Sequence, residues 1–384
     1  MFFVAVLATL LGTAAFAQET GQHFKFYGFI RNYFVYDSHE SSAGAEDLYY
    51  YMPVNTEGNK SSFNFVTLTS RAGVDVLGYE FKDYKIGAKI EADFYLKVNS
   101  TAALRLRQAY VSIAKDKRYW KIGQAWHPMA IDLPDIFSLE SGAPFGPFSR
   151  TPQLTFEYNV KDAHYLTASA IWQMQYTSTG PNGASAEYIK RGIIPEFYVG
   201  YIYRNKSTVF KAGVNILSIK PDESKRLTEV SVFEYFQKKF GDFAFKEKIT
   251  YATDGAHLNM VGGYGKTSAT GDYKYSATRN LSGWMTLAYQ KSKTWVPSIL
   301  VGYIKNFGTS EDVVESWCKN NASTMNMMYR IQPEIVYNLG KLQFGLEYML
   351  TSVQYGDSNS RMRAASNLHW VTNHRVQGLV KFTF

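Results

Sequence analysis

The chain has 384 residues, a formal net charge of +8, 46% hydrophobic and 16% aromatic residues, and one cysteine. A single cysteine excludes a fold held by internal disulfides, and we find no linker, low-complexity block or repeat that would divide the chain. The basic residues are interleaved with acidic ones, which argues against nucleic-acid binding despite the positive charge.

Residues 1–17, MFFVAVLATLLGTAAFA, form an apolar run that ends in Ala-Phe-Ala before Gln18. This pattern predicts a secretory signal peptide with cleavage near Ala17. The run lacks a Lys or Arg near Met1, so the true start could lie upstream. A membrane anchor is the alternative, but the run is shorter than the ~20 residues that a helical span needs. We therefore expect residues 18–384 to form one exported domain.

Period-two alternation of apolar and polar residues dominates the rest of the chain. In the clearest segment, Ile90 and Ala92 fall on one strand face and Glu91 and Asp93 on the other. The pattern predicts sixteen strands, with the weakest signal at 276–292. The predicted strands are 23–37, 62–78, 85–98, two strands flanking the link KDK at 115–117, and 152–160, 165–176, 194–203, 208–218, 227–236, 243–252, 282–290, 295–305, 326–338, 342–354 and 370–384.

The connections between these strands alternate between short polar links and mostly longer ones, such as 38–61, 126–150 and 254–277. Short turns at one end and long loops at the other are typical of an up-and-down transmembrane β-barrel in a bacterial outer membrane. Lipid tolerates only structures whose backbone groups are all paired, and a closed barrel has no free edge. The sequence therefore predicts an antiparallel all-β barrel of about sixteen strands surrounded by outer-membrane lipid.

The stretch 104–150 combines two strands with a long loop rich in Pro and Gly. In its first strand, alternation places Leu104, Leu106 and Tyr110 on one face and Arg105, Arg107 and Ala109 on the other. The loop behind it carries Asp132, Asp135 and Glu140 and is the third long-side connection. Recurring arginines followed by an acidic loop predict a water-filled interior with a loop folded into it.

The last strand ends in Phe384, with Phe382, Val380 and Val376 on the same face. A terminal Phe behind alternating apolar residues resembles the assembly signal of bacterial outer-membrane barrels. Recognition of Phe382 and Phe384 by the barrel assembly machinery is therefore expected. The alternative is an ordinary last strand that ends in Phe by chance.

Four strings, TSRAGVDV, KIEADFY, LRLRQAYVSI and KIGQAWHP, resemble the DcaP-like branch of outer-membrane porins. They lie within residues 69–128. The resemblance implies a sixteen-stranded barrel, a homotrimer, and a third extracellular loop that narrows the pore. It also implies passive diffusion of small hydrophilic, preferentially anionic solutes, with Arg71, Arg105 and Arg107 lining the pore and 126–150 as the constricting loop. The chain lacks the N-terminal coiled-coil segment of some members, which leaves the mode of trimerisation open.

Alternation also assigns further charged side chains to the lumen. A basic wall would focus the field and attract anions, whereas the alternative is that these cations only pair with acids on neighbouring strands. The acids of the long loop, Asp132, Asp135 and Glu140, would either face the basic wall or decorate a surface loop. The predicted pore-lining residues are the basic Arg31, Arg71, Lys89, Arg105, Arg107, Lys121 and Arg375 and the acidic Asp75, Glu91 and Asp93.

Other function classes have weaker support. The seven histidines show no metal-ligand spacing, and no cofactor or metal is expected. An outer-membrane enzyme would need a His and an acid at the loop-side rim, for which His127 with Asp132 is the candidate. A surface receptor or adhesin with an occluded lumen would use the aromatic segment at 47–55, DLYYYMPVN.

Overall fold

The computed structural model describes residues 23–39, 52–54, 57, 59–98, 101–138, 140–222 and 224–384. The predicted signal peptide and most of the segment 47–55 lie outside these ranges. Within them, no helix is both long enough and apolar enough to cross a membrane. The described residues also contain no group of three or more His, Cys, Asp or Glu side chains that could hold a metal ion.

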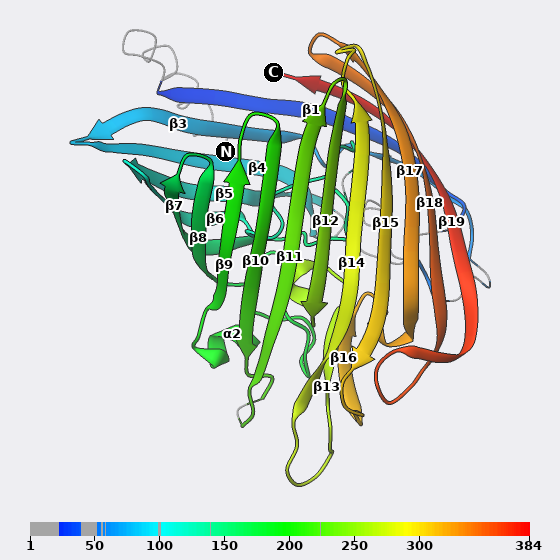
Figure 1. Ribbon diagram of the computed structural model, residues 1–384. Helices are drawn as coiled ribbons and strands as arrows, with labels where there is room; N and C mark the ends of the chain where they lie inside the picture. Colours follow the sequence, from blue (N-terminus) through cyan, green and yellow to red (C-terminus); the bar gives the residue numbers. More distant parts are fainter. Residues whose placement is uncertain are drawn as a thin grey trace.

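The described chain forms an antiparallel sheet that closes on itself (Figure 1). Consecutive strands pair around the ring, and the last strand returns to pair with the first. The ring has sixteen positions, which confirms the predicted barrel. Its strands are β1 (Phe24–Asp37), β2 (Ser62–Val66) with β3 (Arg71–Phe81), β4 (Tyr84–Val98), β5 (Thr101–Lys115), β6 (Arg118–Trp126), β7 (Arg150–Lys161), β8 (His164–Ile171), β9 (Glu196–Arg204), β10 (Thr208–Ile219), β11 (Leu227–Phe240), β12 (Phe243–Thr253), β14 (Tyr275–Tyr289), β15 (Trp295–Thr309), β17 (Met325–Leu339), β18 (Leu342–Ser358) and β19 (Ala364–Thr383).

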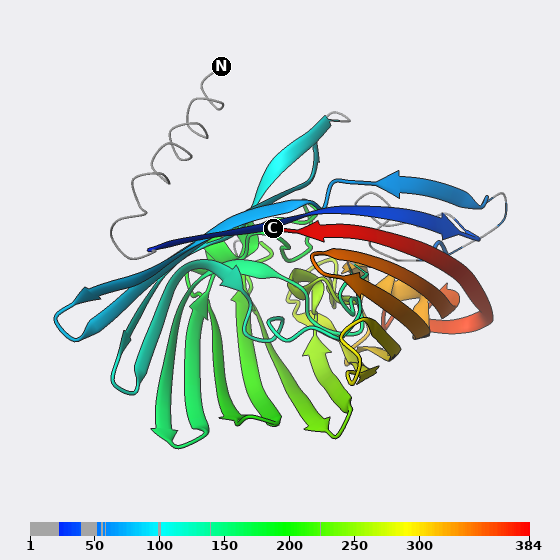
Figure 2. The ribbon, with the colours of Figure 1, turned by 90° about the horizontal axis from the view of Figure 1, so that it is seen from above.

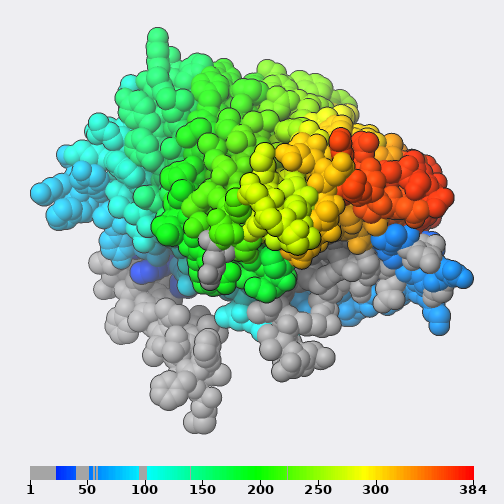
Figure 3. Space-filling view, turned by 90° about the horizontal axis from the view of Figure 1, so that it is seen from below, coloured from blue at the N-terminus to red at the C-terminus, as the bar shows by residue number. Residues whose placement is uncertain are grey.

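Two parts of the sheet depart from the rule of one strand at each of the sixteen positions of the ring. β2 and β3 share a position, because both pair with β1 and a turn at 67–70 interrupts them. β13 (Gly262–Lys266) and β16 (Glu315–Lys319) pair with each other and extend the sheet beyond the ring at the end of β14. In Figure 3 the yellow-to-orange residues of this extension lie against the green strands.

Side chains alternate between an apolar outer face and a polar inner face. In β14, Leu281, Met285 and Leu287 are exposed on the outside, whereas Ser282 and Thr286 are buried on the inside. Such a belt would be unfavourable in water, but it matches a hydrocarbon layer. The weak segment at 276–292 is thus a full strand, because lipid on one side and a polar interior on the other impose the alternation.

The two ends of the barrel differ, as predicted. One end carries both termini of the ring and the short turns 82–83, 116–117, 162–163, 205–207, 241–242, 290–294 and 340–341. We call this the turn end. The other, the loop end, carries the longer connections together with the short ones 99–100 and 359–363, and 127–149 is the third connection there. A short helix, α2 (Glu187–Gly192), lies at this end with the 3-10 turns η1 (Ala256–Leu258) and η2 (Ala322–Thr324). The sequence showed no helical periodicity for α2, which spans less than two turns.

The segment 127–149, called the third loop below, packs against the inner face of the wall. The ring of its Phe145 covers Gly302 of β15, where an added Cβ would lie only 2.6 Å from it. Met129 and Phe145 are fully buried in a cluster with Trp284 and Leu300 of β14 and β15. Figure 2 shows the third loop between the green strands and the orange-to-red strands.

One local prediction about β5 was wrong. The register between β4 and β5 shifts so that Glu91 pairs with Gln108 and Ala92 with Leu106, which leaves Arg107 as the extra residue of a β-bulge. Leu104 and Leu106 face outward and Arg107 inward, but the alternation changes phase after the bulge. Tyr110 therefore lies on the inner side, and Val111 is 44% exposed on the outer face. Plain alternation cannot anticipate one inserted residue.

Two strands of the barrel contain a proline. Pro297 lies in β15 and Pro333 in β17. The ladder between β17 and β18 omits Gln332 and Pro333 and resumes at Glu334 in the same register. The missing amide of Pro333 therefore interrupts the pairing locally without moving the strand.

Candidate channel lumen

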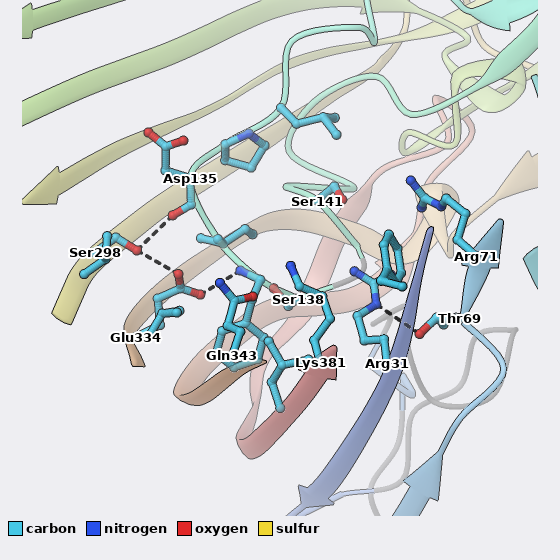
Figure 4. Close-up of a pocket in the computed structure, with 18 of the residues that line it drawn as sticks. Arg31, Thr69, Arg71, Asp135, Ser138, Ser141, Ser298, Glu334, Gln343 and Lys381 are labelled. Atoms are coloured by element: carbon cyan, nitrogen blue, oxygen red, sulfur yellow. Dashed lines mark hydrogen bonds between the residues drawn. The ribbon is translucent and has the colours of Figure 1, made fainter. Parts of the chain in front are cut away.

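A cavity of about 490 Å³ lies inside the barrel, between the third loop and two facing stretches of wall. Strands β1, β3, β4 and β5 form one side, and β14, β15, β17 and β18 form the other. In Figure 4, Arg31 and Arg71 lie on one side of this cavity, Asp135 and Glu334 on the other, and Lys381 of β19 between them. Charges of opposite sign therefore face each other across the space.

Two of the predicted pore arginines are held in ion pairs. Arg105 makes a bidentate contact with Asp93, at 2.9 and 2.8 Å. Arg107, on the bulge, donates to Glu91 at 2.7 Å and to Asp93 at 2.6 Å. Arg71 adds a longer contact to Glu91, at 3.7 Å. The arginines and acids of neighbouring strands thus largely neutralise one another, the pairing that the sequence left open.

Two further predicted residues are engaged nearer the turn end. Lys89 pairs with Asp75 at 2.6 Å and donates to the Tyr27 hydroxyl at 2.9 Å. The ammonium of Lys121 lies over the ring of Tyr110, 5.2 Å from its centroid. Neither lysine lines the cavity, although both are on inward-facing positions.

Arg375 requires a correction, because its side chain is not exposed to a pore. It forms a bidentate pair with Asp37, with both contacts at 2.8 Å, and both residues are fully buried. The pair links β1 to β19 where the ring closes. Of the predicted charged residues, those that line the cavity are Arg31, Arg71, Arg105, Arg107, Asp93 and Asp135, and those that do not are Lys89, Lys121, Arg375, Asp75, Glu91, Asp132 and Glu140.

The acids of the third loop contact cations of the wall opposite the arginines. Asp132 accepts two hydrogen bonds from Lys211 of β10, both at 2.8 Å. Asp135 pairs with Lys246 of β12 and also lines the cavity. Asp132 therefore neither faces the arginines nor decorates an outer surface, but ties the loop to β10.

Two buried cations hold the rest of the third loop. Arg330 of β17 contacts Glu140 at 3.2 Å, and both side chains are almost fully buried. Lys248 of β12 donates to the backbone carbonyls of Met129 at 2.8 Å and Asp132 at 2.6 Å. A buried ammonium needs such acceptors, so Lys248 fixes the path of the loop.

Two charged residues that line the cavity, Lys381 and Glu334, were missed by sequence reasoning. Lys381 lies between Val380 and Phe382. The apolar residues of this terminal segment were interpreted as an assembly signal, and Lys381 was passed over, although alternation alone predicts that its side chain points inward. Glu334 follows Pro333 in β17. It accepts hydrogen bonds from the amide of Phe137 at 2.8 Å and from Ser298 at 2.9 Å, so it also supports the third loop.

A buried polar cluster lies where the third loop meets the loop end. The carboxylate of Glu196 accepts from Asn215 at 2.7 Å and contacts the Nε2 atoms of His127 and His257, both at 3.1 Å. Nearby, burial raises the pKa of Asp254 to about 6. Burial alone would lower the pKa of His257, but the neighbouring Glu196 and Asp254 carboxylates outweigh it and raise that pKa.

This cluster bears on the enzyme alternative. His127 contacts Glu196, whereas Asp132 binds Lys211. The pair proposed from sequence is therefore not a His–acid dyad. Of the aromatic segment considered for a receptor, residues 52–54 are described, and Met52 is buried.

Comparisons with known proteins agree with this geometry. The model of the DcaP outer membrane protein family matches residues 14–143. The crystal structure of the outer membrane channel DcaP of Acinetobacter baumannii is similar, with a TM-score of 0.74 at 17% identity over 94% of this chain and 97% of that chain. No curated protein matches the chain.

More distant barrels share the same fold. An anion-selective porin from Comamonas acidovorans has a TM-score of 0.59 at 9% identity, over 94% of this chain and 99% of that one. The trimer form of OmpT from Vibrio cholerae has a TM-score of 0.53 at 12% identity, with the same coverage. The family model matches residues 14–143, and together with the sixteen-stranded architecture it makes the chain similar to the DcaP outer membrane proteins, with the fold of the porin barrels.

Proposed function

We propose that the barrel is a passive channel that prefers small hydrophilic anions. The observation that carries this proposal is the charge balance of the cavity, whose lining includes five basic side chains and three acidic ones. The basic residues are Arg31, Arg71, Arg105, Arg107 and Lys381, and the acidic ones are Asp93, Asp135 and Glu334. In a narrow space with low-dielectric walls, an excess of one sign concentrates counter-ions.

The cations of the lining differ in how strongly they attract a passing anion, because some are paired with acidic side chains. Arg105 and Arg107 are largely neutralised by Asp93 and Glu91. Lys381 is half-buried, and among the described residues no carboxylate lies within 4 Å of its ammonium. Arg31, its neighbour, donates to the neutral hydroxyl of Thr69 at 3.1 Å. The attraction for anions therefore centres on Lys381.

The third loop is the proposed constriction. Its Asp135 and Ser138 line the cavity, and its contacts with Lys211, Lys248 and Arg330 hold it against the opposite wall. We also propose a homotrimer, since OmpT of Vibrio cholerae, with the same fold, has a trimer form. We further propose that the signal peptide is cleaved near Ala17. We also propose that the barrel assembly machinery recognises Phe382 and Phe384, which are exposed on the outer face.

The direct test is the reversal potential of the purified protein in planar bilayers with a KCl gradient. We expect a sign that corresponds to chloride preference. That preference should weaken as ionic strength rises, because the Debye length is about 10 Å at 0.1 M. A cation-selective or non-selective channel would refute the anion preference, and a barrel without conductance would refute the channel itself.

A further inference from the structure

The turn end of the barrel exposes a lysine at or beside every one of its seven short turns. Lys82, Lys117 and Lys206 lie within turns, and Lys161 and Lys239 lie in the last residues of the strands before turns. Lys293 and Lys341 occupy the two remaining turns. All seven are exposed. We call these seven residues the turn-end lysines.

Few of these charges are neutralised by the protein. Of the acids at this end, Asp83 pairs with Lys115 at 3.4 Å and Asp242 with Lys291 at 3.5 Å, and neither lysine belongs to the set. Within the described ranges, no carboxylate lies within 4 Å of a turn-end lysine. The turn end therefore presents a ring of cations that have no carboxylate partner within 4 Å among the described residues, although Lys117 donates to the carbonyl of Val160 at 3.3 Å.

Aromatic side chains fix the depth of this ring. Phe81, Phe240, Phe243 and Trp295 are between 40% and 64% exposed on the outer face, and each lies within two residues of a short turn. Aromatic residues of membrane proteins gather at the boundary between hydrocarbon and headgroups. The turns continue for only two to five residues, so their lysines cannot extend far beyond that boundary. The ammonium of Lys82, for example, remains 5.5 Å from the ring of Phe81.

We propose that the turn-end lysines bind the phosphate groups of anionic phospholipids in the membrane leaflet at this end of the barrel. Phosphates of lipid headgroups occupy the layer in which the lysines lie, and ammonium groups bind them as point charges. Seven cations spread around the circumference form a girdle that selects lipids by charge. They do not converge on one site, so many lipids bind weakly and exchange.

Lipid selection can be measured by quenching of tryptophan fluorescence in vesicles that contain brominated lipids. Brominated phosphatidylglycerol is compared with brominated phosphatidylcholine. Trp295, which directly follows the turn that contains Lys293, reports on lipids bound near the turn-end lysines. The wild-type protein should prefer the anionic lipid. A variant with Lys82→Gln, Lys206→Gln, Lys239→Gln and Lys341→Gln should lower the ratio of the two binding constants toward about one.

The matched control removes the same charge at the loop end, through Lys190→Gln, Arg191→Gln, Lys274→Gln and Arg363→Gln, four exposed residues. It should keep the preference. An equal loss in both variants, or an unchanged preference in the turn-end variant, would overturn the proposal. Should the turn-end variant not fold, the wild-type protein still decides, because its preference must fall steeply with added salt. Absence of a lipid preference, together with lysine-dependent sedimentation with peptidoglycan sacculi, would assign the ring to a different polyanion and reject the lipid proposal.

Discussion

Arg31 and Lys381 are directly opposite each other across the seam where β1 pairs with β19 and the barrel closes. Two like charges at opposed positions of a sheet are destabilising, so this pair does not serve the strand pairing. Both side chains line the cavity. Two residues along β19 from this pair, the buried Leu379 is instead opposite the buried Tyr33. Farther along, the buried ion pair of Asp37 and Arg375 joins the same two strands. We interpret Arg31 and Lys381 as charges placed for the cavity.

The ion pairs of Arg107 predict a stability effect. Arg107→Met removes the cation that bridges Glu91 and Asp93, both nearly buried, and leaves Glu91 with only the longer contact to Arg71. Removing one partner of a buried pair costs about 3–5 kcal/mol. We expect a loss of this size in the free energy of unfolding in urea. Adding Glu91→Gln should restore part of it, whereas a loss that the second substitution deepens would contradict the pairing.

The outer face predicts a depth-dependent cost. Ile90 is 52% exposed on that face of β4, and Ile90→Arg should destabilise the folded barrel by about 2–4 kcal/mol if it lies at the bilayer midplane. Glu91 cannot serve as the inward-facing control, because it holds Arg107. Asn338→Arg, in the cavity lining and opposite the neutral Gln343, is the better control and should fold normally. Similar unfolding midpoints for the two variants would show that the faces are misassigned.

The buried cluster at the loop end predicts a pH dependence. The pKa of Asp254 is raised to about 6 and that of His257 is also raised, so the folded state binds both protons more tightly than the unfolded state. The stability they contribute is complete below the unfolded pKa and is lost as pH rises through the folded pKa. His127, Glu196, Lys319 and the buried carboxyl of Glu229 face the same cluster.

Packing of residues 254–261 should therefore loosen as the pH rises from about 4 through about 6 and above, which limited proteolysis with proteinase K would detect. Asp254→Asn, which stays neutral, should remove the acidic part of this dependence. Cleavage that increases toward acidic pH would have the opposite sign and would exclude this account of the cluster.

The contacts of Lys248 predict an effect on conductance. Lys248→Met leaves the carbonyls of Met129 and Asp132 without that donor, at about 1–3 kcal/mol per unsatisfied group. The third loop should become less firmly held, and single-channel recordings should show larger open-channel fluctuations. Lys293→Met, at a turn, is the control and should behave as wild type. Recordings identical for both variants would mean that the third loop does not limit the current.

The sequence predicted the barrel well, because lipid outside and water inside force alternation on every strand. It predicted the inward direction of Arg105 and Arg107 for the same reason. Alternation contains no information on register, however, so it could not show that Arg107 is the inserted residue of a bulge or that it meets Glu91. The partners of Asp132 and Glu140 depend on the path of the third loop, where no periodicity exists. Lys381 was accessible to alternation and was missed because the terminal aromatic pattern dominated the interpretation.

The central claim is that cations facing the cavity make the channel prefer anions, with Lys381 as the cation least neutralised by the protein. Its most direct test is the reversal potential in a KCl gradient for the wild type, Lys381→Gln and the turn-end control Lys341→Gln. Each protein is measured separately, in bilayers of the same lipid composition. We predict that Lys381→Gln moves the reversal potential toward that of an unselective pore, while Lys341→Gln leaves it at the wild-type value. An unchanged reversal potential for Lys381→Gln, or an equal shift for Lys341→Gln, would contradict the account.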